Sequence, residues 1–91
     1  MRERNIEDYL HRRVLALGGE YRRMQWTGRK HAPDDFVMLY DPPRHMLFEC
    51  KRPGEVAEPG QVREHDRLRR AGVAIHTVTT CAEIDAILPL N

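Results

Sequence analysis

The sequence is short of cysteine, of aromatic residues and of long apolar segments. The lack of paired cysteines and the lack of long apolar segments each exclude a class of protein. Cys50 and Cys81 lack a CxxC motif or any Cys/His spacing, so we expect neither a disulfide framework nor a structural zinc site. Aromatic residues make up 7% of the chain, and no apolar run approaches the roughly 18 residues that a membrane span needs. The sequence therefore indicates a protein of the reducing cytoplasm, with no export and no membrane insertion.

An excess of charge of one sign is also missing. Fifteen basic and fourteen acidic residues leave a net charge of +1, which gives no overall signal for binding a polyanion. The charged residues, 32% of the chain, form no low-complexity runs, so a disordered chain is not expected. The 91 residues predict a single domain, 1–91, so small that a symmetric partner would help to complete its core.

Hydrophobic spacing in the first half of the chain predicts one helix followed by three strands. Residues 6–17 carry one apolar face at helical spacing, and a pair of glycines ends this helix. A short strand is expected within residues 20–26. Two apolar runs, 36–40 and 46–48, are separated by a Pro-Pro turn, so they should pair as an antiparallel hairpin.

The second half predicts a helix, a strand and a closing helix. Pro59 begins a polar helix that ends near residues 71–72, and residues 73–78 form a buried strand. Because a helical crossover joins this strand to the preceding one, the two should be parallel. Thr80 and Glu83 have the spacing of a capping box, which starts the last helix. The expected fold class is α/β, a mixed sheet flanked by helices in the order α-β-β-β-α-β-α.

Residues suited to phosphodiester chemistry fall at one end of the predicted hairpin. Pro33-Asp34 precedes its first strand, and Glu49-Cys50-Lys51 ends its second. Since strand side chains alternate, Glu49 and Lys51 share a face while Cys50 points away, and Asp34 can meet them across the hairpin. Two carboxylates with a backbone carbonyl and water suit octahedral Mg²⁺, and a nearby ammonium can stabilise charge that develops during hydrolysis.

Each of these features also has an ordinary structural explanation. A Pro-Asp turn and a same-face Glu-x-Lys ion pair are common in proteins without catalytic function. Glu7 is either solvated helix surface or an acid facing the sheet, and its spacing leaves both readings open. Gln61 alone is most simply a residue of the first helical turn, and His65 alone is a packing residue. Only the conjunction of the features points to catalysis.

Several short motifs occur in a specific order along the chain. They are 6–10 (IEDYL), 17–19 (LGG), 28–34 (GRKHAPD), 48–54 (FECKRPG), Gln61 and 67–72 (RLRRAG). In this order and spacing they resemble the VRR-NUC branch of the PD-(D/E)xK nuclease superfamily over nearly the whole chain. The resemblance implies a restriction-endonuclease-like core, which agrees with the element order. Its small standalone members are typically encoded by phages and bacteria, so the expected location is the cytoplasm of a bacterium or a phage-infected host.

The resemblance implies a DNA endonuclease that depends on Mg²⁺ or Mn²⁺ and hydrolyses phosphodiester bonds. Catalytic or metal-binding roles are implied for Asp34, Glu49, Lys51, Gln61, Glu7 and the backbone carbonyl of Cys50. Asp34, Glu49 and this carbonyl look like metal ligands, as does Glu7 on the first helix. Lys51 looks like the catalytic lysine, and Gln61 like the motif glutamine.

Two departures from the family pattern leave alternatives open. Asp35 directly follows Asp34, so a change of one residue in register would exchange the ligand; Asp34 is preferred because it directly follows Pro33. Cys50 stands where an apolar residue is more usual, and its thiol has no role if only the carbonyl is used. The choice between Mg²⁺ and Mn²⁺, and between one and two ions, also stays open.

The predicted partner is DNA. Basic residues near the two motifs could contact phosphates without reading sequence, although solvated helix and strand faces are a competing explanation. These residues are Arg22, Arg23, Arg29, Lys30 and Arg52. Small standalone members resemble Holliday-junction resolvases and form symmetric dimers, which implies a homodimer acting on branched DNA. The alternative is a DNA-binding module that keeps the fold without cleaving.

Overall fold

The computed structural model describes residues 3–90, and within them the chain forms seven helices and strands. They are α1 (Glu3–Ala16), β1 (Glu20–Arg23), β2 (Asp35–Tyr40), β3 (Pro43–Cys50), α2 (Pro59–Arg70), β4 (Ile75–Val78) and α3 (Cys81–Ile87). This order confirms the predicted α-β-β-β-α-β-α arrangement. No helix in the described range is long and apolar enough to cross a membrane.

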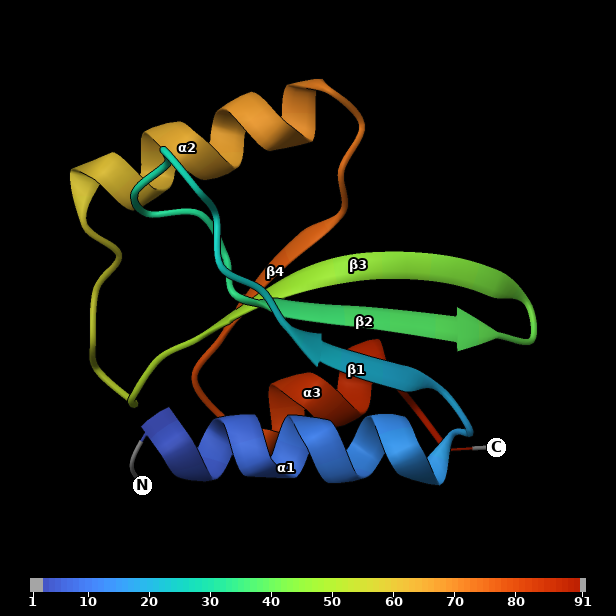
Figure 1. Ribbon diagram of the computed structural model, residues 1–91. Helices are drawn as coiled ribbons and strands as arrows, with labels where there is room; N and C mark the ends of the chain where they lie inside the picture. Colours follow the sequence, from blue (N-terminus) through green and yellow to red (C-terminus); the bar gives the residue numbers. More distant parts are fainter. Residues whose placement is uncertain (1–2, 91) are drawn as a thin grey trace.

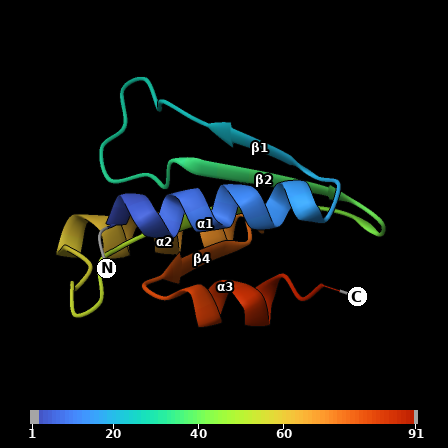
Figure 2. The same cartoon turned by 90° about the horizontal axis from the view of Figure 1, so that it is seen from below.

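The strands form one mixed four-stranded sheet in the spatial order β1-β2-β3-β4. β1 pairs with β2 and β2 with β3 in antiparallel fashion, whereas β3 and β4 are parallel, as the α2 crossover predicts. Helices α1 and α3 lie side by side on one face of the sheet, and α2 lies on the other side (Figures 1 and 2). The predicted fold class is therefore confirmed.

The hydrophobic core lies between the sheet and the α1–α3 layer. Ile6, Leu10 and Val14 are completely buried and follow the helical spacing that predicts α1. Phe48 of β3 and Ile84 of α3 are also fully buried in this cluster. Because α1 and α3 both press on the sheet from this side, the other face is left to α2 and the loop that precedes β2 (Figure 1).

The bounds of the strands differ from the predicted ones where the chain leaves the sheet. β1 ends at Arg23 rather than continuing towards residue 26, because the following segment rises from the sheet towards α2 (Figure 1). β3 begins at Pro43, three residues before the apolar run, since its exposed first half extends the hairpin with β2. In both places pairing with a neighbouring strand, rather than apolar spacing, sets the boundary.

Candidate active site

The start of β2 and the end of β3 meet at one end of the sheet. Asp35 pairs with Phe48 in the antiparallel register, so Asp34, one residue earlier, lies opposite Glu49. The backbone supports this placement because Met24 N donates to Asp34 O at 2.7 Å, which extends the β1–β2 ladder. Directly opposite residues of an antiparallel pair point to the same face, with Cβ atoms about 5 Å apart. Asp34 and Glu49 therefore face the same side.

Lys51 joins this pair directly after β3. Its backbone N donates to Val78 O at 2.9 Å, so the parallel β3–β4 ladder holds the residue in place. Lys51 is 5% exposed, and the side chain of Glu49 is 13% exposed, whereas that of Asp34 is 50% exposed. The site thus has a buried lysine, a partly buried glutamate and an aspartate that is open to solvent. Partial burial raises the pKa of Asp34, and the nearby Arg23 opposes this rise.

Arg23 connects Glu7 with the two aspartates. Its guanidinium lies 3.4 Å from a Glu7 carboxylate oxygen, 3.4 Å from Asp35 Oδ1 and 3.8 Å from Asp34 Oδ2. Glu7 therefore faces the sheet rather than bulk solvent, which settles the alternative that its spacing leaves open. Three acids from α1 and the start of β2 share one arginine at the edge of the site.

Asp35 is turned to the α1 face and is engaged there. It is 1% exposed, and Tyr21 Oη donates to its Oδ1 at 2.6 Å. Burial, with the hydrogen bond to Asp35, raises the pKa of Tyr21. Burial also raises the pKa of the Cys50 thiol, and the carboxylates of Asp35, Glu7 and Glu49 add to the rise. The thiol stays protonated, because burial and the nearby carboxylates both oppose its ionisation.

Helix α2 brings an unpredicted residue to the site. His65 is 3% exposed, and its Nε2 lies 3.9 Å from Glu49 Oε1. This distance is too long for a hydrogen bond, and among residues 3–90 Nε2 has no hydrogen-bond partner. Burial lowers the pKa of the imidazole, and the positive charges of Arg69 and Lys51 lower it further. A neutral, buried ring nitrogen thus lies beside the Glu49 carboxylate.

Gln61, predicted as a site residue, takes part in the start of α2. Its Oε1 accepts a hydrogen bond from Glu58 N at 3.0 Å, as part of a capping box. Gln61 lies one helical turn before His65, so the two share a face of α2. This i, i+4 relation is a signal in the sequence that could have drawn attention to His65.

Glu64, the neighbour of His65, ties the loop before β2 to α2. Its side chain is 4% exposed, and it accepts hydrogen bonds from Arg29 of the loop and from Arg67, one turn later in the helix. These two hydrogen bonds lower the pKa of Glu64 to about 2. Nothing in the sequence separates this buried acid from the solvated acids of the same helix. The contact holds the segment that leads to Asp34.

The predicted DNA-contacting residues lie in different settings. Arg22 is exposed and pairs with Glu20, and Arg23 is occupied by the acids of the site. Arg29 pairs with Glu64, while Lys30 and Arg52 are exposed at the surface. The structure therefore does not gather the five into one group: two of them, Arg29 and Lys30, lie together on the loop beside α2.

Comparisons with known proteins decide the family. A solved structure described as "VRR_NUC domain" matches with a TM-score of 0.84 and 31% sequence identity, covering 93% of this chain and 91% of that one. The chain belongs to the VRR-NUC family. "Putative nuclease p44" of Acyrthosiphon pisum secondary endosymbiont phage 1 is 38% identical over 90 residues, which cover 98% of this chain and 94% of that protein. None of the protein-family models matches the chain.

The donor atoms of this VRR-NUC site suit a hard divalent cation. The carboxylates of Asp34 and Glu49 and the carbonyl oxygen of Cys50 are ligands that Mg²⁺ and Mn²⁺ prefer. Within residues 3–90, no group of three or more His, Cys, Asp and Glu residues is placed to hold a metal ion. An ion here would complete its coordination with the backbone oxygen and water, as Mg²⁺ commonly does. The residues fit such an ion on this basis.

Proposed function

We propose that the protein is a divalent-metal-dependent DNA endonuclease that hydrolyses phosphodiester bonds. The observation that carries this proposal is the placement of Asp34, Glu49 and Lys51 at one end of the β2–β3 hairpin. Membership of the VRR-NUC family and the similarity to the phage protein "Putative nuclease p44" support it. A domain that only binds DNA would not need a buried lysine next to a partly buried carboxylate.

Each residue of the site has a role in this proposal. Asp34, Glu49 and the Cys50 carbonyl hold Mg²⁺ or Mn²⁺, which when bound polarises a phosphoryl oxygen and acidifies an attacking water. Lys51 orients that water and stabilises the negative charge that develops on the phosphate, and its burial strengthens this interaction. Cleavage leaves 5′-phosphate and 3′-hydroxyl ends.

Two further residues act at the edge of the site. Glu7 holds Arg23, and through it the carboxylate of Asp34, in a fixed position. Gln61 fixes the first turn of α2 and thereby the position of the face that carries His65. A direct role for Glu7 as an additional metal ligand requires that Arg23 move away from it, since the two side chains are in contact.

The proposed substrate is branched DNA, cut by a homodimer. A domain of 91 residues buries only about 60–65% of the surface that its unfolded chain exposes, less than a larger domain does, so a second copy would add to its core. A two-fold axis would place two sites against two strands of a junction. Analytical ultracentrifugation at micromolar concentration should give the mass of two chains, and a single-chain mass at all concentrations would contradict the dimer.

The experiment that tests the function compares cleavage of several labelled DNAs. Four-way junction, flap, single-stranded and duplex DNA are incubated with the protein in Mg²⁺, Mn²⁺ or EDTA. We expect cutting only with metal, with the junction or flap preferred, and none by Glu49→Gln. Glu20→Gln, at the opposite end of the sheet, is the matched control and should cut as the wild type does. Absence of cutting with every DNA and metal would contradict the proposal.

Metal binding is measured separately from cleavage. An ion that binds only the folded protein raises the midpoint of thermal unfolding, and the rise is larger for tighter binding. Mn²⁺ and Mg²⁺ should raise this midpoint in the wild type and in Glu20→Gln, but not in Glu49→Gln or Asp34→Asn. An equal rise in all four proteins would place the ion elsewhere.

A further inference from the structure

Six of the fifteen basic residues of this nearly neutral chain lie on α2 and the adjacent loop. Helix α2 carries Arg63, Arg67 and Arg70 at positions i, i+4 and i+7, which lie on one face of a helix. The loop before β2 places Arg29 and Lys30 beside this row. We call these five residues the α2 arginine surface. The net charge of the whole chain, +1, hides this local excess.

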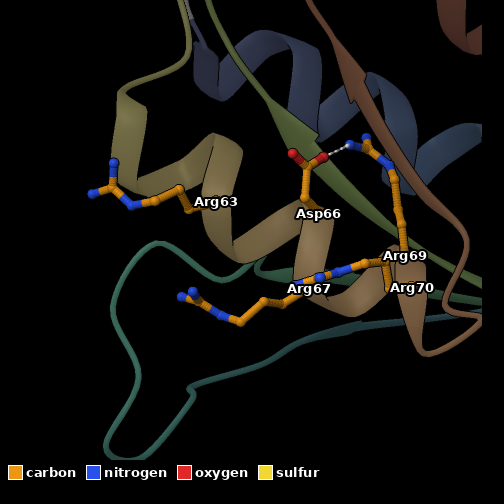
Figure 3. Close-up of a pocket in the computed structure, with 5 residues that line it drawn as sticks. All are labelled: Arg63, Asp66, Arg67, Arg69 and Arg70. Atoms are coloured by element: carbon orange, nitrogen blue, oxygen red, sulfur yellow. Dashed lines mark ion pairs between the residues drawn. The ribbon is translucent and has the colours of Figure 1, made fainter.

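Two adjoining hollows make the α2 arginine surface continuous. One is lined by Arg63, Asp66, Arg67, Arg69 and Arg70 (Figure 3). The other is lined in part by Arg29, Lys30, Arg63 and Arg67. Because Arg63 and Arg67 line both hollows, the surface runs without interruption from the loop to the last turn of α2.

Some of these cations are held by the protein and others are unpaired. Arg67 contacts Glu64 at 2.8 Å, and Arg69, at the edge of the surface, contacts Asp66 at 3.7 Å (Figure 3). Arg63 and Arg70 are exposed and make no ion pair with any residue in the range 3–90. Along α2, Arg67 is held by its ion pair, while Arg63 before it and Arg70 after it make none with the described residues. Two such positive charges separated along a helix suit an extended polyanion better than a single small anion.

We propose that the α2 arginine surface binds the phosphate backbone of a duplex DNA arm that the active site does not cut. The row from Arg63 to Arg70 is about 10 Å long at the rise of an α-helix. Phosphates follow one another every 3.4 Å or so along the axis for one strand of a duplex, so the row spans about three of them. Contacts to the backbone position a duplex without reading its sequence.

The position of the surface relative to the active site identifies the bound segment as a separate arm. His65, which lies beside Glu49, is two residues from Arg63 and therefore lies about 200° around the helix from it. The surface and the active site thus occupy opposite sides of α2. Arg29 and Lys30, however, belong to the loop that leads to Asp34. The loop that binds DNA on the outer side of α2 therefore continues into the active site, where another part of the same DNA would be cut. This inference rests on the proposed function.

The test measures binding of a labelled duplex as a function of salt. The variant Arg63→Gln/Arg70→Gln removes the two arginines of the surface that make no ion pair within residues 3–90, and both side chains are exposed, so the fold should persist. The matched control, Arg12→Gln/Arg44→Gln, removes two exposed arginines from α1 and the β2–β3 hairpin. All proteins carry Glu49→Gln to prevent cleavage. Fluorescence anisotropy gives the affinity between 50 and 300 mM KCl, a range over which the Debye length falls from about 14 Å to about 6 Å.

Loss of two phosphate contacts should lower the slope of log affinity against log salt by about 1.8. We expect this reduction, and at least a tenfold weaker affinity at the lowest salt, for Arg63→Gln/Arg70→Gln but not for the control. Equal slopes in the two variants would overturn the inference. An equal loss of affinity for polyglutamate would overturn the assignment to duplex DNA. A failure of the proposed nuclease function would be seen in a different experiment, as absent DNA cleavage by the wild-type protein, so it can be distinguished from a failure of this inference.

Discussion

His65 Nε2 lies 3.9 Å from Glu49 Oε1, buried and without a hydrogen-bond partner among residues 3–90. A buried polar atom usually has a partner, because leaving it unpaired costs about 1–3 kcal/mol. At 3.9 Å the imidazole packs against the Glu49 carboxylate without a hydrogen bond between them. We therefore expect His65 to be a positioning residue that limits where the Glu49 carboxylate can turn.

Replacement of His65 should lower the affinity for the metal ion more than it lowers the stability of the fold. Residues that orient a metal ligand typically change metal affinity or activity by about 10–100-fold when they are substituted. We expect His65→Ala to need a correspondingly higher Mn²⁺ concentration for half-maximal cleavage. His65→Asn keeps a polar group in place and should recover part of the loss. A lower maximal rate at unchanged Mn²⁺ dependence would contradict this role.

Asp34 and Asp35 should respond differently to the same substitution. Asp34→Asn should abolish cleavage without changing the free energy of unfolding, because its side chain is half exposed. Asp35→Asn should keep cleavage but lower that free energy by about 1–3 kcal/mol, since Asp35 is the buried acceptor for Tyr21. Asp41→Asn, in the hairpin turn, is the control for both. If only Asp35→Asn lost cleavage, Asp35 rather than Asp34 would be the metal ligand.

Lys51 should be essential for the rate and dispensable for DNA binding. Removal of one group that stabilises developing charge typically costs about 100- to 1000-fold in kcat. We expect such a loss for Lys51→Met, whose side chain still fills the buried space. DNA affinity, measured by anisotropy in Ca²⁺, should stay within a factor of about three, less than 1 kcal/mol. Full cleavage by this variant would remove Lys51 from the mechanism.

The contact between Glu64 and its two arginines should depend on pH. Hydrogen bonds from Arg29 and Arg67 lower the pKa of Glu64 from 4.5 to about 2 in the folded protein. A lowered pKa stabilises the fold above the ordinary value, and this contribution disappears as the pH falls from 4.5 towards 2. Urea unfolding should show wild type more stable than Glu64→Gln near pH 7, with the difference shrinking towards pH 2. A difference that is constant over this range would contradict the assignment.

A side chain at Gly19 should destabilise the fold more than one at the adjacent Gly18. A Cβ on Gly19 would lie 2.6 Å from the Met38 carbonyl oxygen, which belongs to the β2 backbone and cannot move freely. Gly19→Ala should therefore cost about 1–3 kcal/mol of unfolding free energy. Gly18 has a φ of +74° but open space around its Cβ position. Gly18→Asn therefore meets only the backbone strain of the left-handed region, which Asn tolerates better than most residues, and should cost less than Gly19→Ala in the same urea titration. Equal costs would show that β2 can shift.

Local patterns in the sequence were sufficient for the elements and for the centre of the candidate site. The spacing of Ile6, Leu10 and Val14 predicts α1 and its buried face, and the predicted capping box at Thr80 is present at the start of α3. Both depend on residues within one or two turns of each other, where periodicity and hydrogen bonding are local. The membership of the VRR-NUC family, predicted from the order of the motifs, is confirmed.

Contacts between distant segments depended on the tertiary structure. The sequence by itself determined that Asp34 could meet Glu49, because strand alternation and one hairpin are sufficient for that. Only the packing of α2 decided that His65 lies beside Glu49, and only the position of α1 decided that Glu7 shares Arg23 with the aspartates. A polar residue has the same local signature whether it faces water or another element. Its partner is set by how the helices pack on the sheet, which no periodicity within a single element encodes.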